Sequence, residues 1–313
     1  MKTENGNKPK IIIVGGATAS GKSDLALKIC GDFGGALISA DSMQIYKRLN
    51  IGTAKPTLSE RTAIHHYLID IKEPWENYSA ANFVCDAKVA INDALSRGML
   101  PVICGGTGLY IEALIHPTEY DKSTGIDDIL REKLSARDAH SLWEELNGID
   151  PEAASAIHEN NKKRVVRALE IYYNTGKTKT ETDREQKKYN SDFDYLLLIT
   201  DFSDRDALYE KINRRVDLMV KNGLVEETRE LLERKDLREG TTAYQAIGYK
   251  EFFPYFNGEK SLDECIDKLK QATRNYAKRQ ITWFSRYGGV RVRDYKDAQA
   301  AVKTFLKGGD GNG

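Results

Sequence analysis

A glycine-rich octapeptide at residues 16–23 (Gly-Ala-Thr-Ala-Ser-Gly-Lys-Ser) constrains this chain more than any other stretch. It follows the apolar run 11–14 and precedes a segment with helical spacing. A strand, a glycine-rich turn and a helix in this order are typical of a P-loop, whose backbone N–H groups and helix N-terminus surround an anion. Lys22 would add a mobile positive charge, and the Ser23 hydroxyl could bind Mg²⁺. The predicted phosphate or diphosphate site consists of Gly16, Ala17, Thr18, Ala19, Ser20, Gly21, Lys22 and Ser23.

Composition limits the class of protein without identifying it. The 313 residues are 40% hydrophobic and 30% charged, as is ordinary for a globular protein. Lys plus Arg and Asp plus Glu number 47 each, so the total charge gives no argument for a polyanionic partner. The four cysteines lack metal-binding spacing, and no apolar run approaches the ~18 residues of a membrane span. We therefore expect a soluble, cytosolic, monomeric protein with reduced thiols, no zinc site and no membrane segment.

Short apolar runs alternate with helical patterns, which predicts an α/β fold of the P-loop NTPase-like class, a parallel sheet with helices on both faces. Between 117 and 192 only helical patterns occur, and we expect an all-helical insertion there. Residues 1–116 and 193–313 would then form the P-loop catalytic core. Segments 44–60 and 177–190 show no clear periodicity, and the glycine-rich tail 308–313 is expected to be disordered. The expected strands are 11–14, 36–39, 65–71, 101–104, 195–199 and 290–292.

Ligand sites in parallel sheets lie at the carboxyl ends of the strands. The P-loop, Asp41 and Thr107 each follow the end of an expected strand, so they should meet at one rim. Asp41 could be an N-cap or a carboxylate near a magnesium ion, or it could be a general base, and its spacing leaves these roles open. Thr107 could cap the helix that starts near Leu109 or could belong to the site. Arg215 lies on an expected helix from which it could reach a phosphate.

The neutral total charge hides two basic concentrations, at 160–180 and 268–293. In the second, Lys270, Arg274 and Lys278 follow at intervals of four residues and share one helix face. Such a face can be merely solvated. It can also bind the phosphate backbone of a nucleic acid, and the neighbouring aromatic residues would suit a base.

Further blocks carry a resemblance to a known family. They are Ala-Asp-Ser-Met-Gln-Ile-Tyr at 40–46, Ile-Gly-Thr-Ala-Lys-Pro at 51–56, Gly-Gly-Thr-Gly-Leu-Tyr at 105–110, Arg-Ala-Leu-Glu at 167–170, Thr-Gly-Lys at 175–177, Ala-Ile-Gly-Tyr-Lys at 246–250 and Ala-Lys-Arg-Gln-Ile-Thr-Trp-Phe at 277–284. With the P-loop, these blocks resemble the bacterial tRNA dimethylallyltransferases, in family order from about residue 11 to 286. The P-loop is widely shared among nucleotide-binding proteins, whereas the other blocks together are far more specific.

The resemblance implies transfer of a dimethylallyl group from dimethylallyl diphosphate to the exocyclic amine of the adenosine 3′-adjacent to the anticodon in tRNA. The P-loop, which alone would suggest ATP, would hold the prenyl diphosphate. Asp41 would be the general base, and Thr107 would support that site and the diphosphate. Lys22, Arg215 and Mg²⁺ bound by Ser23 would stabilise the leaving diphosphate.

The resemblance also implies contacts with the tRNA anticodon stem-loop, which the helical insertion at 117–192 would help to bind. They fall on Asp41, Ser42, Met43, Gln44, Arg131, Lys163, Arg164, Arg167, Gln245, Gly248, Tyr249, Lys250, Lys278, Arg279, Gln280 and Trp283. The sequence departs from the family at Ala17, often Pro, at Ser23, often Thr, and in the segment 116–120. These departures are mild at the loop, because alanine stays small and serine keeps the hydroxyl.

Three rival functions fit parts of the sequence. A P-loop kinase of a small molecule explains residues 16–23 but not the Gly-Thr-Ala-Lys-Pro block. An adenylate isopentenyltransferase, which prenylates a free adenine nucleotide, would not need a helical insertion. A non-enzymatic RNA-binding module would not need Lys22 and Asp41 at one rim.

Overall fold

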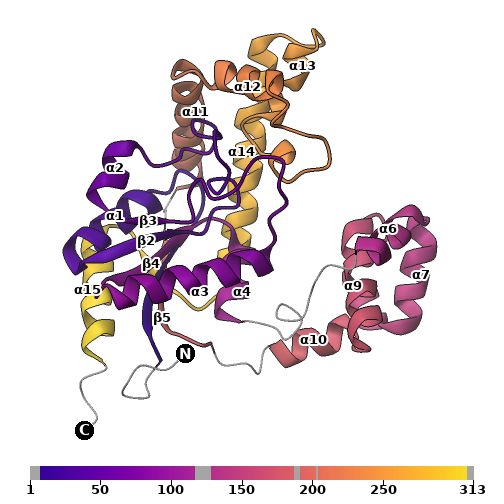
Figure 1. Cartoon of the computed structure of the whole chain (residues 1–313), viewed down its shortest axis with the longest axis horizontal. Coiled ribbons are helices and arrows are strands. Elements are labelled where there is room, and N and C mark those ends of the chain that lie inside the picture. The colour runs from indigo at the N-terminus through magenta and orange to yellow at the C-terminus, as the bar shows by residue number, and fades with distance from the viewer. Residues whose placement is uncertain (1–7, 117–127, 187–190, 202–203, 309–313) are drawn as a thin grey trace. The chain divides into compact units, whose positions relative to one another are not determined.

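The structure is a computed structural model that describes residues 8–116, 128–186, 191–201 and 204–308 (Figure 1). The predicted disordered tail lies outside these residues beyond Gly308, as do most of the atypical segment 116–126 and the end of segment 177–190. The chain forms two compact units, which we call the core unit (Met1–Ile111 with Asp192–Gly313) and the helical unit (Glu112–Ser191). The sequence prediction draws these boundaries at 116/117 and 192/193.

The core unit contains a six-stranded sheet in the order β3-β2-β4-β1-β5-β6, with every pairing parallel. The predicted α/β class with a parallel sheet is thereby confirmed. The third strand is shorter than the predicted 65–71, because Leu68 and Asp70 adopt left-handed backbone conformations (φ 61° and 58°) that end its pairing. The strands are β1 (Lys10–Gly15), β2 (Gly35–Ser39), β3 (His66–Tyr67), β4 (Leu100–Gly105), β5 (Asp194–Thr200) and β6 (Val290–Val292).

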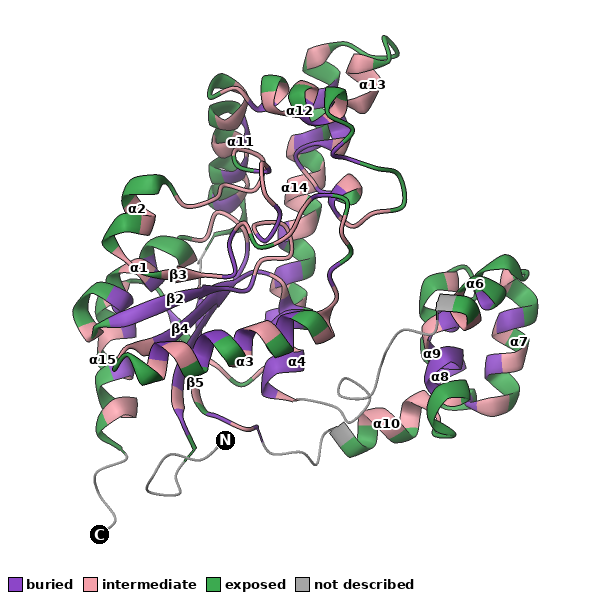
Figure 2. Ribbon diagram, viewed as in Figure 1, coloured by how far each residue is buried: buried purple, intermediate pink, exposed green. Residues whose placement is uncertain are grey.

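Helices cover both faces of the sheet, which explains why its strands read as continuous apolar runs. Ile12 and Val14 belong to the cluster that packs against α1 (Lys22–Phe33) and α15 (Tyr295–Lys307). Successive strand residues point to opposite faces, so Ile11 and Ile13 face the other side, where α3 (Ala80–Ser96) and α4 (Gly108–Ile115) run (Figures 1 and 2). The sequence prediction missed α15, although Ala298 and Val302 on one face of it are fully buried.

Two long helices, α11 (Arg205–Lys221) and α14 (Leu262–Phe284), pack against each other beside the sheet. The basic face predicted on α14 is turned toward α11 and contacts it at three levels. The contacts are Lys270 Nζ to Asp217 Oδ1 at 2.6 Å, Arg274 Nη1 to Asn213 Oδ1 at 2.6 Å, and Lys278 Nζ over the ring of Tyr209 at 5.7 Å. Positions 270, 274 and 278 of α14 contact positions 217, 213 and 209 of α11, respectively. The numbers rise along one helix as they fall along the other, so the two helices are antiparallel. Lys270 and Arg274 thus have polar partners on α11, which favours a structural role for them, and phosphate binding by this face stays a prediction.

The remaining elements of the core unit are short or lie beside α11. They are α2 (Leu58–Ala63), α12 (Leu224–Glu233), α13 (Phe253–Phe256) and the 3-10 helices η1 (Ala243–Gln245) and η2 (Lys250–Phe252). Helix α2 begins within the segment 44–60 that was predicted to be irregular, and it starts with a capping box in which Thr57 and Glu60 bond each other's backbone N–H groups.

The helical unit has its own core, formed by Leu134, Leu142, Leu146, Val165 and Leu169 among others. Its helices are α6 (Asp128–Ala136), α7 (Ala139–Ile149), α8 (Pro151–Ala156), α9 (Lys162–Thr175) and α10 (Lys179–Gln186). The sequence prediction missed α10 because its sequence lacks an apolar stripe. This helix is tied instead by the buried Asp150, which accepts hydrogen bonds from Thr180 N (2.9 Å) and Thr180 Oγ1 (2.6 Å).

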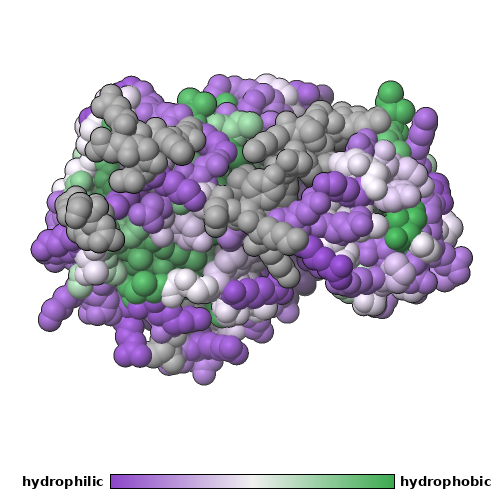
Figure 3. Space-filling model, turned by 90° about the horizontal axis from the view of Figure 1, so that it is seen from below, coloured by the Kyte–Doolittle hydropathy of each residue, from purple (hydrophilic) through white to green (hydrophobic). Residues whose placement is uncertain are grey.

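Hydrophilic side chains predominate on the face seen in Figure 3, and hydrophobic ones gather there in small areas. Among the described residues, none of the helices combines the length and the apolar character that crossing a membrane requires.

Candidate functional site

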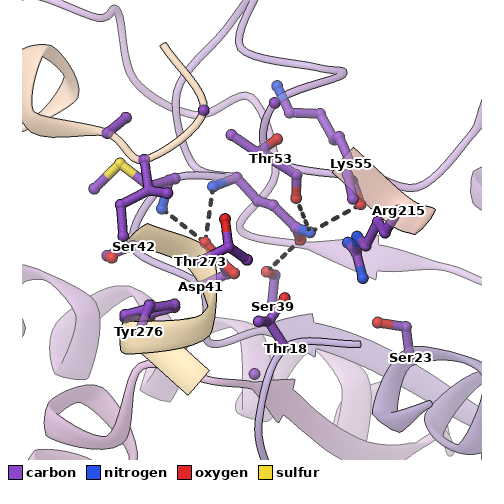
Figure 4. A pocket seen from close by; sticks show the side chains of 18 of the residues that line it. Thr18, Ser23, Ser39, Asp41, Ser42, Thr53, Lys55, Arg215, Thr273 and Tyr276 are labelled. Carbon is purple, nitrogen blue, oxygen red and sulfur yellow. Dashed lines mark hydrogen bonds between the residues drawn. The ribbon is translucent and has the colours of Figure 1, made fainter. Parts of the chain in front are cut away.

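Four neighbouring strands, β2, β4, β1 and β5, end at one edge of the sheet, and each delivers polar groups there. A cavity of about 490 Å³ opens at this edge and is walled by α11 and α14. In the view of Figure 4, Ser23 and Arg215 lie at one side of it, Ser42 and Tyr276 at the other, and Asp41 and Thr18 between them. The expected meeting of the P-loop with the residues after β2 is thus seen in the structure.

The P-loop joins β1 to α1 and is braced by Thr200 at the end of β5. The Thr200 hydroxyl bonds Ser20 Oγ at 2.6 Å and donates to the Gly15 carbonyl at 3.3 Å. A Cβ on Gly16, which has φ 151°, would lie 2.0 Å from Thr200 Oγ1, so only glycine fits there. Sequence reasoning missed Thr200, although its place at a strand end opposite the P-loop was the available signal.

Two cations of the cavity are poorly solvated. Burial lowers the pKa of Lys22, an effect that nearby Cys104 and Asp41 oppose and Arg215 reinforces. Burial also lowers the pKa of Arg215, against the opposing effect of Asp41 and Asp24. Lys22 Nζ donates to the Ala17 carbonyl at 3.2 Å, and neither cation forms an ion pair within the described part of the chain. An anionic ligand would supply the compensation that these groups lack.

The donor atoms at the mouth of the P-loop suit a magnesium ion that a substrate helps to bind. Ser23, exposed at the start of α1, lines the cavity together with Thr18 and Asp24, and all three offer oxygen. Mg²⁺ prefers oxygen ligands and usually keeps several waters while sharing phosphate oxygens with few protein groups. The described residues hold no cluster of three or more His, Cys, Asp or Glu that could bind a metal alone, and such a site would therefore need the diphosphate.

Asp41 lies in a turn after β2 and is half-buried on the cavity wall. Its Oδ1 accepts hydrogen bonds from Met43 N at 2.9 Å and from Gln44 N at 3.3 Å. Within the described residues, Oδ2 has no hydrogen-bond partner. One carboxylate oxygen of Asp41 therefore holds the turn, and the other is available to a ligand.

Thr107 stands behind Asp41 and does not itself line the cavity. Its Oγ1 accepts a hydrogen bond from Ser42 N at 3.0 Å, and its backbone N–H donates to the Ala40 carbonyl at 3.3 Å. Thr107 thus fixes both neighbours of Asp41. The resemblance implies that Thr107 supports both this site and the diphosphate; the contacts seen in the structure are with the neighbours of Asp41.

Gln44 and the Gly-Thr-Ala-Lys-Pro block are bound to each other (Figure 4). The Gln44 amide donates to the carbonyls of Thr53 (3.2 Å) and Ala54 (3.3 Å), and its oxygen accepts from Ser39 Oγ (3.0 Å). Lys55 is turned into the protein, where it meets Asp70 Oδ1 at 2.6 Å. Lys55 thus forms an ion pair within the protein. Gln44 was predicted to contact tRNA, but its amide is hydrogen-bonded to other residues of the cavity wall.

Glu227 on α12 fastens this wall to the block at 246–250. Its carboxylate accepts backbone N–H groups of residues 50–52 at 2.9–3.2 Å and the hydroxyl of Tyr249 at 2.7 Å. Tyr249 is fully buried, and a Cβ on Gly52 would lie 2.5 Å from its ring. In this structure Tyr249 therefore packs inside the protein, whereas Gly248, also predicted to contact tRNA, is buried but borders the cavity. Sequence reasoning missed Glu227, for which no local signal exists.

The other residues predicted to contact tRNA divide by their surroundings. Ser42, Met43, Gln245, Lys250 and Arg279 line the cavity.

Three others lie on α14. Lys278 is exposed beside Tyr209, and Trp283 packs against Gly108 and stacks on Tyr287 at 4.3 Å. Gln280 is buried and borders the cavity.

The last four lie in the helical unit. There Lys163 and Arg164 are exposed, whereas Arg131 holds the buried Glu170 with two bonds of 2.6 and 3.0 Å and Arg167 lies 3.5 Å from it.

Tyr276 of α14, one of the aromatic residues beside the predicted basic face that would suit a base, lines the cavity. Burial, reinforced by the Asp41 charge, raises the pKa of its hydroxyl to about 12, and hydrogen bonds with Thr107 and Gln280 act in the opposite direction. Tyr276 is therefore a neutral hydroxyl beside Asp41 at ordinary pH.

Comparison with known proteins gives concordant matches. The model of the IPP transferase family matches residues 44–287. A tRNA dimethylallyltransferase of Thermoanaerobacter sp. (strain X514) is 44% identical over 305 residues, which cover 95% of this chain and 96% of the relative. The crystal structure of a tRNA isopentenylpyrophosphate transferase from Staphylococcus epidermidis is similar with a TM-score of 0.70 and 37% identity, covering 96% of this chain and 99% of that one. A eukaryotic dimethylallyltransferase acting on tRNA gives a TM-score of 0.82 at 31% identity, covering 96% of this chain and 80% of that one.

Proposed function

The chain belongs to the IPP transferase family of tRNA dimethylallyltransferases, and from this premise we propose which bond it makes and with which residues. It is a prenyltransferase that modifies tRNA. We propose that the donor is dimethylallyl diphosphate and that the acceptor is the exocyclic amine N6 of the adenosine 3′-adjacent to the anticodon. The C1–O bond of the donor breaks, a C1–N6 bond forms, and diphosphate leaves with the electron pair of the broken bond.

The P-loop side of the cavity is suited to the leaving group. An allylic diphosphate ionises readily once the charge that develops on its oxygens is neutralised. Lys22 and Arg215 supply two poorly solvated positive charges, and the P-loop supplies backbone N–H groups. Mg²⁺, held by Ser23 and the diphosphate, would add Lewis-acid neutralisation.

The opposite side of the cavity is suited to the acceptor. An adenine amine is a weak nucleophile, so it must be held against C1 and lose a proton as the bond forms. Asp41 Oδ2 is the group we propose for that proton, since Oδ1 is already held by two backbone N–H groups. Thr107 keeps the Asp41 turn in place through Ser42. The single observation that carries the proposal is that one cavity holds both the cation pair and this carboxylate.

The tRNA must present its base out of the stack to reach this cavity, as in other enzymes that act on nucleobases. We propose that the anticodon stem-loop is the part of tRNA bound, with the exposed Lys163 and Arg164 of the helical unit on its phosphates. Every group named here comes from one chain, so the proposal needs no second copy.

A transfer assay tests the proposal against its rivals. The protein is incubated with Mg²⁺, radiolabelled dimethylallyl diphosphate and either unmodified tRNA or AMP, and the labelled nucleoside is located by nuclease digestion and mass spectrometry. We expect label in tRNA alone, on the adenosine after the anticodon. Label in AMP and not in tRNA would indicate an adenylate isopentenyltransferase, and phosphoryl transfer from ATP without prenyl transfer would indicate a kinase.

A further inference from the structure

Gln280 of α14 is one of the few polar side chains buried in the core unit, with 5% of its surface exposed. Both ends of its amide are engaged with backbone on opposite sides. Its Oε1 accepts the N–H of Thr18 in the P-loop at 2.8 Å, and its Nε2 donates to the Gly106 carbonyl after β4 at 2.9 Å. One side chain thus connects the two loops that leave the central strands.

The glycines after β4 leave the space that this connection needs. A Cβ on Gly106 would lie 2.1 Å from Gln280 Nε2, and a Cβ on Gly105 would lie 2.1 Å from the Ala40 carbonyl oxygen. A side chain at Gly105 would therefore displace the chain before Asp41, and one at Gly106 would displace the Gln280 amide. The Gly-Gly-Thr block is shaped to fit Gln280 on one side and the Asp41 turn on the other.

The contacts continue from Gly106 to the carboxylate. Thr107, the next residue, bonds Ser42 N through its hydroxyl and the Ala40 carbonyl through its N–H. Ala40 and Ser42 flank Asp41. An unbroken series of bonds therefore runs from the Thr18 N–H through Gln280, Gly106 and Thr107 to both neighbours of Asp41.

We propose that Gln280 is a positioning residue and not a contact to tRNA. It sets the distance between the Asp41 carboxylate and the diphosphate cradle, by which we mean the P-loop at residues 16–23. The inference deepens the proposed function and rests on it. Gln280 borders the cavity, but both ends of its amide are already bonded to Thr18 and Gly106, so the amide acts through these two loops. Reacting atoms must meet at about 3–3.5 Å, and a displacement near 1 Å can lower the rate by about 10²-fold, so a residue that fixes this distance controls turnover.

The test compares Gln280→Met with Gln271→Met, the same substitution at an exposed glutamine of the same helix. Methionine has a similar length but cannot bond either loop. For Gln280→Met we expect kcat at saturating substrates to fall about 10²-fold while tRNA affinity, measured without donor, is unchanged. Affinity for Mg²⁺-pyrophosphate should fall about 2–10-fold, the value of one lost hydrogen bond to the cradle. Gln271→Met should match the wild type.

Gln280→Glu provides a readout that a purely structural role would not move. The new carboxylate can accept the Thr18 N–H but cannot donate to Gly106, whereas its protonated form can do both. Its kcat relative to wild type should therefore rise as the pH is lowered, and that of Gln280→Met should not. A loss of tRNA affinity with kcat retained would overturn the proposal, and so would unchanged kcat and pyrophosphate affinity in Gln280→Met. Lack of prenyl transfer by the wild type would instead overturn the proposed function, and the pyrophosphate measurement would still decide whether Gln280 shapes the cradle.

Discussion

The core unit contains two groups of cations that the structure treats in opposite ways. Along α14, Lys270 and Arg274 meet Asp217 and Asn213 of α11 at 2.6 Å, so their charged groups already have polar partners. At the cavity, Lys22 and Arg215 are poorly solvated and, among the described residues, lack an ion pair. The first group joins two helices, whereas the second retains charge that a ligand can use.

This difference shows why a run of basic residues is weak evidence for a polyanion site. Charge and helical spacing place Lys270, Arg274 and Lys278 on one face, but they do not reveal that a second helix covers it. Lys22 and Arg215 lie far apart in the sequence and attract notice only through the P-loop and the resemblance. What distinguishes the two groups is whether a partner within the protein is already present.

The largest effect that the comparison predicts is on turnover. Lys22→Met or Arg215→Met should each lower kcat by about 10²–10³-fold, because each removes one charge from the leaving diphosphate. Lys270→Met should leave kcat unchanged and cost at most about 1 kcal/mol of stability, since its ion pair is partly exposed. Transfer rates at saturating substrates measure kcat, and thermal unfolding measures the loss of stability. Equal losses of kcat at Lys22 and Lys270 would break the distinction.

A smaller effect is expected on the salt dependence of tRNA binding. Lys163→Gln and Arg164→Gln in the helical unit should each reduce the slope of log K against log salt by about one, as for a lost phosphate contact. Lys270→Gln and Arg274→Gln should leave the slope unchanged, because their charged groups face α11. Filter-binding titrations at several salt concentrations measure the slopes. A reduced slope for the α14 variants would show that the basic face of α14 contacts RNA.

Much of the sheet could be predicted, because buried parallel strands leave continuous apolar runs such as residues 11–14, and because sites gather at strand ends. The order of the strands in the sheet could not be predicted, and neither could the contacts between residues that lie far apart in the sequence. Thr200 and Glu227 act on loops about 180 positions away in the sequence; Thr200 is marked only by its place at a strand end, and no local pattern marks Glu227. Tyr249 and Gln280 belong to motifs that the resemblance assigns to tRNA contact, yet both side chains are buried. A motif thus identifies residues that matter without saying whether they touch the substrate or hold the residues that do.

The division of the rim into a cradle for the leaving group and a carboxylate for the proton is tested most directly at Asp41. Asp41→Asn keeps an oxygen that can accept the Met43 and Gln44 N–H groups but cannot take a proton at neutral pH. Single-turnover transfer from dimethylallyl diphosphate to saturating tRNA, with tRNA affinity measured in parallel, separates the two roles. We expect the transfer rate to fall by about 10²–10⁴-fold with tRNA affinity retained. A retained rate with weakened tRNA binding would show that Asp41 is a contact and not the base.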